Sequence, residues 1–236
     1  MCQLWQGGEE AGIDLKSCAA CKLVKYCSRD CQLAHRSQHK KACKRRAKEL
    51  HDEKLFKQPP PLEDCPICMI RMPHLTSVQV YMACCGKVMC RGCVYAFQSR
   101  VSKKEESVCP FCRVPAPSSN DELVQRYKNR AELNDAVAIR NLGSFYRLET
   151  YEFPQNYAKA LELFHRAAEL GDSQSYYSIG NAYEFGRGVG VDKKKAIHYW
   201  ELAAMEGNVD ASFNLGVVGR PDRQYGQSIK TFYECD

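Results

Sequence analysis

The sequence predicts a multidomain chain in which two small metal-stabilised α+β modules precede an all-α solenoid of helical repeats. Three observations support this fold class. Fourteen of the 15 cysteines in the 236-residue chain occur no later than Cys112. Two proline-containing linkers divide the chain. The segment after the second linker repeats itself with a period of about 36 residues, which suits one helix–turn–helix unit per repeat.

Most of the cysteines occur in closely spaced pairs. These pairs are Cys18/Cys21, Cys27/Cys31, Cys65/Cys68, Cys90/Cys93 and Cys109/Cys112. A two-residue gap lets one tight turn direct two thiolates at one ion, and this spacing is typical of zinc fingers. A disulfide-rich secreted chain is the alternative, but the N-terminus has no signal-peptide pattern. We therefore expect zinc-stabilised modules in a cytoplasmic or nuclear protein, where disulfides are rare.

Charge and hydropathy bear on the expected partners. No apolar run reaches the length of a spanning helix, so no membrane partner is expected. The net charge is +6, and the densest basic run is Lys40, Lys41, Lys44, Arg45, Arg46 and Lys48. Such a run can bind nucleic acid or direct nuclear import. We favour the solvated face of a helix, so nucleic acid is not the expected partner and nucleic-acid binding is a third hypothesis. No aromatic residues alternate with these charges, which argues against a stacking platform for single strands.

Two linkers set the expected domain boundaries. Residues 57–61 (KQPPP) form a stiff, extended spacer. Residues 114–119 form the second linker, after which Ser119 or Asn120 can cap a new helix. The predicted domains are a first finger at 1–43, a basic helix and Pro-rich linker at 44–62, a second finger at 63–114, a linker and connecting helix at 115–130, helical repeats at 131–218 and a degenerate C-terminal tail at 219–236.

Three short patterns recur in order within the second half. Leu142-Gly143-Ser-Phe-Tyr recurs as Ile179-Gly180-Asn-Ala-Tyr, Lys-Ala-Leu as Lys-Ala-Ile, and Ala-Ala followed by Gly171 as Ala-Ala followed by Gly207. The small residues allow paired helices to approach closely, and the last two glycines stand where helices must stop. The pattern resembles Sel-one-like repeats, which are relatives of the tetratricopeptide array. It predicts two repeats plus one helix.

The first cysteine group resembles the MYND-type zinc finger. The resemblance rests on Cys18-Ala-Ala-Cys21, Tyr26-Cys27, Cys31, His39 and Cys43. In that family the first and third pairs of ligands bind one zinc, and the second and fourth pairs bind the other. The resemblance implies one complete site made of Cys18, Cys21, His39 and Cys43. Because Cys31, His39 and Cys43 are separated by multiples of four residues, we expect them on consecutive turns of one helix.

The other MYND site departs from the family pattern. It contains Cys2, Cys27 and Cys31, but Trp5 stands where the fourth ligand belongs, and tryptophan cannot bind zinc. We interpret this as an incomplete structural site, because no acid–base partner lies nearby in sequence. Water or His35 are candidates for the fourth position, although for His35 we favour an exposed helix residue. We expect about four zinc ions in the chain, with weaker occupancy here.

The second cysteine group resembles a RING finger. The resemblance rests on Cys65-Pro-Ile67-Cys68, Cys84-Cys85-Gly-Lys87, Cys90-Arg-Gly-Cys93 and Cys109-Pro110-Phe-Cys112-Arg113. It implies cross-braced sites, in which Cys65, Cys68, Cys90 and Cys93 hold one zinc and Cys84, Cys85, Cys109 and Cys112 hold the other. Lys87 stands where many RING fingers have a histidine ligand. Cys85 must then take that role beside Cys84, which strains the chelate geometry.

The RING resemblance implies ubiquitin ligation, in which the module positions a ubiquitin-charged conjugating enzyme without covalent chemistry of its own. Matching positions for binding that enzyme are Ile67, Phe97, Pro110 and Arg113. The leading hypothesis is therefore a RING-type ubiquitin ligase whose MYND finger and repeats bind peptide motifs of partners and protein substrates. The alternative is a non-enzymatic zinc-binding adaptor or scaffold. The sequence has no phosphate-binding glycine loop, metalloprotease motif or nucleophile elbow, so no catalytic residues are predicted.

Overall fold

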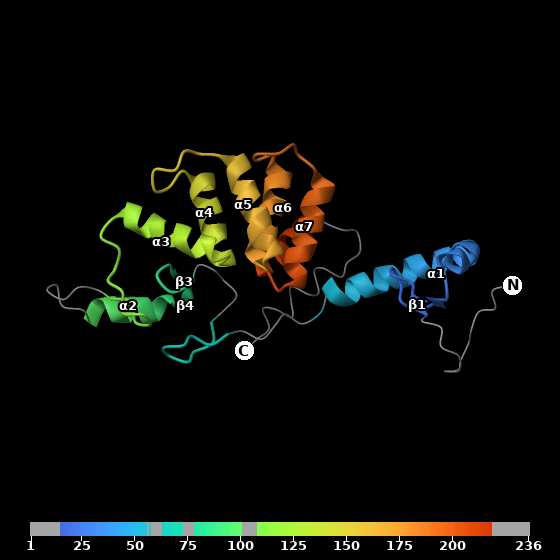
Figure 1. The fold of residues 1–236 in the computed structure, drawn as a ribbon, viewed down its shortest axis with the longest axis horizontal. Helices are drawn as coiled ribbons and strands as arrows, with labels where there is room; N and C mark the ends of the chain where they lie inside the picture. Colours follow the sequence, from blue (N-terminus) through green and yellow to red (C-terminus); the bar gives the residue numbers. More distant parts are fainter. Residues whose placement is uncertain (1–14, 56, 58–62, 73–77, 101–107, 219–236) are drawn as a thin grey trace. The chain divides into compact units, whose positions relative to one another are not determined.

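The computed structural model describes residues 15–55, 57, 63–72, 78–100 and 108–218. These residues form eight helices and four short strands (Figure 1). The chain divides into two units, Met1–Lys57 and Gln58–Asp236. In this described part of the chain, no helix combines the length and the apolar character needed to cross a membrane. The predicted tail at 219–236 and the prolines of the first linker lie outside the described residues.

The first unit contains a small hairpin and one long helix. Strand β1 (Lys16–Ser17) pairs antiparallel with β2 (Lys25–Tyr26). Helix α1 (Arg29–Leu55) follows and crosses the boundary expected between residues 43 and 44 without a break. The basic run lies on this helix, where Arg46 forms ion pairs with Glu49 at 3.2 Å and Glu53 at 2.8 Å. The ligands expected on consecutive helical turns therefore do share one helix, which begins two residues before Cys31.

The second unit begins with another small α+β module. Strands β3 (Gln79–Met82) and β4 (Lys87–Cys90) form an antiparallel hairpin with Gln79 opposite Cys90. Helix α2 (Arg91–Arg100) follows β4 directly. The buried core cluster of this module is Cys65, Met72 and Met89. Around it pack three more cysteines and the partly buried side chains of Met82, Val88, Val94 and Phe111. Little apolar material holds it together, so cysteine chemistry must contribute to its stability.

Six further helices form the repeat array. They are α3 (Asn120–Glu132), α4 (Ala136–Leu148), α5 (Tyr157–Glu169), α6 (Ser173–Phe185), α7 (Lys193–Met205) and α8 (Val209–Val218). Each of these helices contacts the next, and α4 to α7 stand side by side in Figure 1. Ser119 is the N-cap of α3, since its hydroxyl accepts a hydrogen bond from the Glu122 amide at 3.2 Å.

The recurring glycines of the array have identifiable structural roles. Gly171 and Gly207 follow α5 and α7 with φ of +90° and +84°, so both helices stop at a left-handed residue as the sequence predicts. Gly180 lies against the buried ring of Trp200, where an added Cβ would be 2.4 Å from Cδ1. Gly143 lies in the same way against Phe164, at 2.9 Å from Cε1. In each repeat, one large aromatic ring therefore packs against a helical glycine.

Tyr81 of the hairpin module makes both a polar and an aromatic contact with the start of the array. Asp135, the N-cap of α4, accepts hydrogen bonds from the Tyr81 hydroxyl at 2.8 Å and from Nε of Arg130 at 3.0 Å. The Tyr81 ring also stacks on Tyr127 of α3, with centroids 5.8 Å apart. Burial raises the pKa of Asp135, but the hydrogen bonds from Arg130 and Tyr81 outweigh it and hold that pKa below its ordinary value.

Candidate metal centres

Three Cys-x-x-Cys segments adopt the same tight turn. In each one, the residue after the second cysteine has a left-handed backbone: Lys22 (φ 55°), Met69 (φ 58°) and Arg113 (φ 59°). Its amide donates to the carbonyl of the first cysteine at 2.8–2.9 Å, and the first cysteine's amide donates to a carbonyl beyond the turn. This turn directs both sulfurs of a pair to one side, as a shared ion requires.

Each of these turns contributes to a cluster of four candidate ligands. Within a cluster, all four ligand atoms lie within 4.8 Å of one another. The clusters are Cys18, Cys21, His39 and Cys43; Cys65, Cys68, Cys90 and Cys93; and Cys84, Cys85, Cys109 and Cys112. These are the three complete ligand sets that the sequence resemblances imply, and the second and third sets alternate along the chain in cross-braced order.

The distances in the clusters fit tetrahedral zinc. Zinc–sulfur bonds of about 2.3 Å place two sulfurs of a tetrahedron about 3.8 Å apart. The Cys18–Cys43, Cys65–Cys93 and Cys68–Cys90 sulfur pairs are each separated by 3.8 Å, and Cys85–Cys109 by 3.9 Å. The Cys84–Cys112 sulfur pair is only 3.4 Å apart, which is closer than a tetrahedral zinc site requires. This pair belongs to the cluster whose ligands Cys84 and Cys85 are neighbours in sequence. Cysteine and histidine in sets of four are the donors that structural zinc prefers.

The pKa values of the clustered cysteines also favour a bound cation. A hydrogen bond from the Cys21 amide lowers the pKa of Cys18 to about 6. Burial raises the pKa of Cys65, yet backbone amides led by that of Cys90 outweigh it and hold the value at about 6. Burial and neighbouring thiols raise the pKa of Cys43 to about 11 and that of Cys93 to about 12. Each thiolate thus raises the free energy of ionising the neighbouring thiols. A bound dication would offset this repulsion between negative charges.

The structure describes only part of the other ligand set that the MYND resemblance implies. The Cys27 and Cys31 sulfurs lie 3.2 Å apart, but Cys31 is disulfide-bonded in this structure and so is not a free thiolate there. Cys2 and Trp5 lie outside the described residues. His35 is half-buried, and its Nδ1 lies 3.0 Å from the Tyr26 hydroxyl. This arrangement differs from the exposed helix residue that the sequence favoured, because the imidazole packs against both Tyr26 and the stacked ring of His39.

The four positions matched to conjugating-enzyme binding do not form one surface cavity. Ile67 is 47% exposed on the turn between Cys65 and Cys68, and Arg113 is exposed on the equivalent turn at the end of the module. Phe97 and Pro110 instead line a cavity of about 330 Å³ that is also lined by the second linker and by Leu123 of α3. Half of the predicted set is therefore open to solvent, and half faces a hollow beside the connecting helix.

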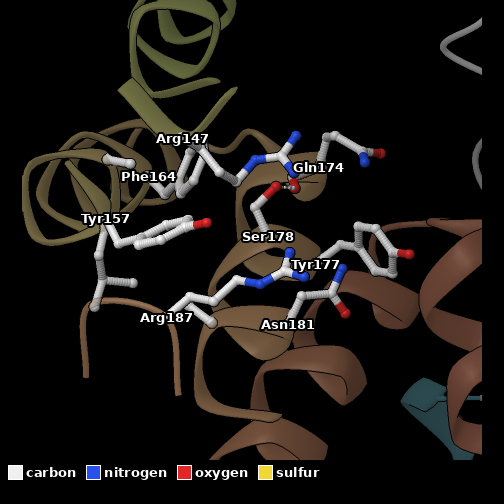
Figure 2. A pocket seen from close by; sticks show the side chains of 11 residues that line it. Arg147, Tyr157, Phe164, Gln174, Tyr177, Ser178, Asn181 and Arg187 are labelled. Carbon is white, nitrogen blue, oxygen red and sulfur yellow. Dashed lines mark hydrogen bonds between the residues drawn. The ribbon is translucent and has the colours of Figure 1, made fainter. Parts of the chain in front are cut away.

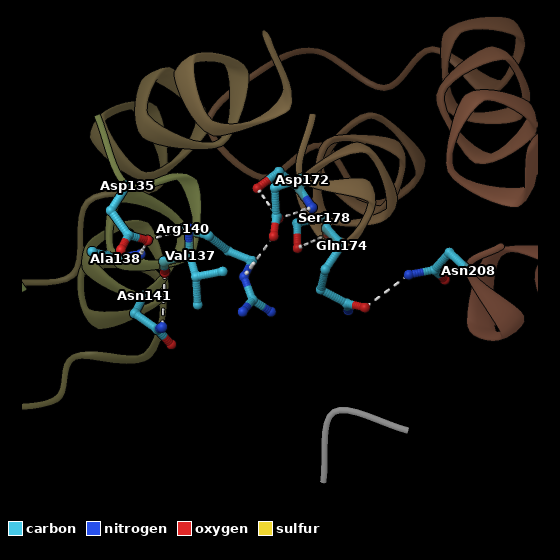
Figure 3. A network of polar contacts seen from close by, with 10 residues as sticks. Asp135, Val137, Ala138, Arg140, Asn141, Asp172, Gln174, Ser178 and Asn208 are labelled. Carbon is cyan, nitrogen blue, oxygen red and sulfur yellow. Dashed lines mark hydrogen bonds and ion pairs between the residues drawn. The ribbon is translucent and has the colours of Figure 1, made fainter. Parts of the chain in front are cut away.

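The repeat array carries polar features that the sequence did not indicate. The N-caps of α4, α6 and α8 are Asp135, Asp172 and Asn208, each near the same position of its repeat. Figure 3 shows them in a network that includes the Arg140–Asp172 ion pair at 3.4 Å and a 2.8 Å hydrogen bond from Asn208 to Gln174. A separate pocket contains two arginines, Arg147 and Arg187 (Figure 2).

Comparisons with protein families agree with this architecture at both ends of the chain. The MYND finger model matches residues 2–43, and the Sel1 repeat model matches residues 136–172 and 173–208. The chain therefore contains a MYND zinc finger followed by two Sel1 repeats, with α8 beyond the second. Both are protein-interaction modules, and the cysteine and histidine clusters indicate zinc binding.

Two curated relatives share part of the sequence. An uncharacterized protein of Neisseria meningitidis is 39% identical over 120 residues, which are 50% of this chain and 25% of the relative. The ERAD-associated E3 ubiquitin-protein ligase component HRD3B of Arabidopsis thaliana is 33% identical over 101 residues, 42% of this chain and 15% of the relative. The chain thus spans a quarter or less of the length of these relatives.

Three solved structures are similar to part of the chain. A Sel1 repeat protein from Oxalobacter formigenes is 26% identical, with a TM-score of 0.44, covering 49% of this chain and 50% of that one. Helicobacter pylori cysteine rich protein B is 29% identical, with a TM-score of 0.39, covering 41% and 72%. A protective antigen of uropathogenic Escherichia coli is 28% identical, with a TM-score of 0.45, covering 51% and 27%.

Proposed function

We propose that residues 63–114 form a RING-type module and that the protein is a ubiquitin ligase whose MYND finger and Sel1 repeats recruit partners. The observation that carries this proposal is the order of the eight cysteines. The first and third pairs share one cluster, and the second and fourth share the other. This cross-brace holds two loops at a fixed separation, which a surface that positions another enzyme requires.

The module would act by binding a conjugating enzyme that carries ubiquitin as a thioester. Zinc would have a structural role only, since all four ligands in each cluster come from the protein and leave no open position. Ile67 would supply an apolar contact, and Arg113 would bridge ubiquitin and the conjugating enzyme. The resemblance of part of the chain to HRD3B, whose name describes a ubiquitin-ligase component, agrees with a role in ubiquitin transfer.

The complete chain would bind four zinc ions under this proposal. Three would occupy the four-ligand clusters, and the fourth would be held weakly by Cys2, Cys27 and Cys31. We place the protein in the cytoplasm or nucleus, where thiols remain reduced and available to zinc.

A non-enzymatic adaptor is the second candidate, and one observation favours it. Phe97 and Pro110 line a cavity that also borders the protein's own linker and Leu123, whereas Ile67 is 47% exposed and does not line that cavity. An adaptor would need only the MYND finger and the repeats to bind partners. The cross-braced module would then serve as a spacer or a third binding surface.

Reconstituted ubiquitination separates the two candidates. The zinc-loaded chain is incubated with ubiquitin, activating enzyme, ATP and a panel of conjugating enzymes, and self-ubiquitination is followed on gels. We expect chains with at least one conjugating enzyme, and a decrease of about tenfold or more for Ile67→Ala and Arg113→Ala. Leu148→Ala and Lys194→Ala are matched controls on the repeats, where a leucine that is 55% exposed and an exposed lysine are removed. If no conjugating enzyme supports self-ubiquitination of the fully zinc-loaded protein, the ligase proposal is wrong and the adaptor is the remaining candidate.

A further inference from the structure

The Sel1 repeats enclose a pocket of about 210 Å³ between α4, α5 and α6. Figure 2 shows the guanidinium groups of Arg147 and Arg187 directed into it, with Ser178 between them. Arg147 comes from the end of α4, and Arg187 comes from the loop after α6. Eleven residues line the pocket, and none of them is acidic. We propose that this pocket binds an anionic group, a carboxylate or a phosphate, carried by a partner peptide.

The two arginines lack the partners that other arginines of the array have. Among the described residues, neither forms an ion pair, and the buried Nε of Arg147 has no hydrogen-bond partner. Burial and the nearby charge of Arg187 lower the pKa of Arg147, so the two cations destabilise each other. The other arginines in α3 to α7 each have an ion pair or a hydrogen bond: Arg126, Arg130, Arg140 and Arg166. The buried Nε of Arg140 also makes no hydrogen bond, but it lies 3.4 Å from the carboxylate of Asp172, whereas Arg147 has no such counter-charge. Two uncompensated cations in one pocket therefore favour an external anion.

The backbone fixes the position of Arg187. Gly186 and Gly188 flank it with φ of +67° and +77°, and the Arg187 amide donates to the carbonyl of Ala182 at 2.9 Å. A Cβ at Gly188 would lie 2.5 Å from the backbone of Tyr157, so only glycine allows this loop to pack on the first turn of α5. The guanidinium carbon of Arg187 lies 5.1 Å from the centroid of the Phe185 ring, in a cation–π contact.

A neutral side chain in the pocket also presents a donor. The Oδ1 atom of Asn181 accepts hydrogen bonds from Trp200 at 3.2 Å and from Asn214 at 3.3 Å. These contacts orient the amide so that its Nδ2 atom faces Arg187 in Figure 2. The pocket therefore offers three sets of N–H donors to one region, which suits a group that only accepts hydrogen bonds.

The size of the pocket indicates what carries the anion. Pockets for drug-sized ligands usually measure about 300–1,000 Å³, so a space of 210 Å³ fits one side chain or chain terminus better than a cofactor. The surrounding Sel1 repeats are protein-interaction modules. An aspartate, glutamate, phosphoserine or C-terminal carboxylate within a bound peptide satisfies both conditions. This inference rests on the proposed role of the repeats in recruiting partners, and it does not depend on ligase activity.

A peptide array tests the inference on the full zinc-loaded chain. The peptides have randomised neutral flanks around one fixed central residue, which is Glu, Asp, phosphoserine or Asn, and their C-termini are either free or amidated. We expect retention on at least one anionic arm and little on the amidated Asn arm, with the arms distinguishing carboxylate from phosphate. Peptides selected from the array are then titrated by fluorescence anisotropy. Arg147→Gln and Arg187→Gln should each weaken binding about tenfold or more, because each removes charge-assisted hydrogen bonds.

The matched control is Lys194→Gln, which removes one exposed positive charge from the same repeats and should change the affinity less than about twofold. Because the two arginines repel each other, Arg147→Gln should leave the melting temperature unchanged or raise it. The inference would be overturned if no anionic arm were retained more strongly than the amidated Asn arm, or if Arg147→Gln and Lys194→Gln had equal affinities. Neither result would affect recruitment of neutral peptides. A lower melting temperature for Arg147→Gln would assign that arginine a structural role and would also overturn it.

Discussion

Replacing Gly180 by alanine tests the packing that shapes the Sel1 repeats. The added Cβ would lie 2.4 Å from Cδ1 and 2.5 Å from Nε1 of Trp200. Carbon atoms in contact prefer separations of about 3.5–4.0 Å, so the indole must move by about 1 Å. Trp200 is only 2% exposed and its Nε1 donates to Asn181, so the ring has little room to do so.

The expected cost follows from two opposing effects. Overpacking of a well-packed core costs about 1–3 kcal/mol, and a contact this short belongs at the upper end of that range. Alanine recovers about 1 kcal/mol through its higher helix propensity. We therefore expect a net loss of about 2 kcal/mol in the free energy of unfolding. For an array of this size, that loss corresponds to a decrease of about 10 °C in the melting temperature.

Thermal unfolding followed by circular dichroism at 222 nm measures the effect. Gly190→Ala is the matched control, because a Cβ added there would have no neighbouring atom within 4 Å, and the midpoint should shift little. Gly143→Ala should fall between the two, since its closest contact is Phe164 at 2.9 Å. A midpoint for Gly180→Ala within 2 °C of Gly190→Ala, where about 10 °C is expected, would refute the packing argument.

Three other predictions concern the metal centres and the N-cap of α4. Chelation should remove hydrogen-exchange protection from the cysteine modules while the helices of residues 120–218 keep theirs; equal loss in both would contradict this. When the zinc-loaded protein is titrated with a chelator, the site of Cys27 and Cys31 should release its ion first. Four equally tight sites would argue against an incomplete site. Because the folded pKa of Asp135 is below 3.8, its ion pair with Arg130 stabilises the fold above that pH and is lost on acidification. The stability difference between wild type and Asp135→Asn should therefore narrow as the pH falls from 5 to 2, roughly the range in which an ion-paired aspartate titrates, and a constant difference in thermal midpoints would oppose this.

The metal-binding half could be read from sequence because its geometry is local. A Cys-x-x-Cys segment needs only one tight turn, and the backbones of Lys22, Met69 and Arg113 form the same turn in three places. The arrangement of side chains around these turns could not be predicted from the sequence in the same way. Nothing in the spacing of cysteines shows that Phe97 and Pro110 face a cavity beside α3, because that depends on how the second linker folds back.

The repeat half shows the same limit in a different form. The glycines and small residues predicted helix boundaries and close helix contacts, because both follow from the steric freedom of a residue without a side chain. The arginine pocket depends instead on a difference between the repeats. With Leu142 aligned to Ile179, Arg147 corresponds to Glu184, which pairs with Lys193 in the second repeat. A position that changes from a paired acid to an unpaired base is the sequence signal that could have indicated this pocket.

The two halves differ in what stabilises them, and this difference determines how they respond to metal. Around the cross-braced clusters, the buried core contains Met72 and Met89 together with Cys65, whereas the array buries large side chains such as Phe164 and Trp200. Full burial of a large apolar side chain contributes about 1.5–3 kcal/mol, so two buried methionines with four partly buried apolar side chains around them cannot offset the entropy of ordering that module. Zinc affinity there is therefore largely folding free energy, while the array keeps its own core when metal is removed. A zinc-depleted protein should consequently lose any RING-type activity and still bind anionic peptides, which makes metal content the variable that separates the two functions.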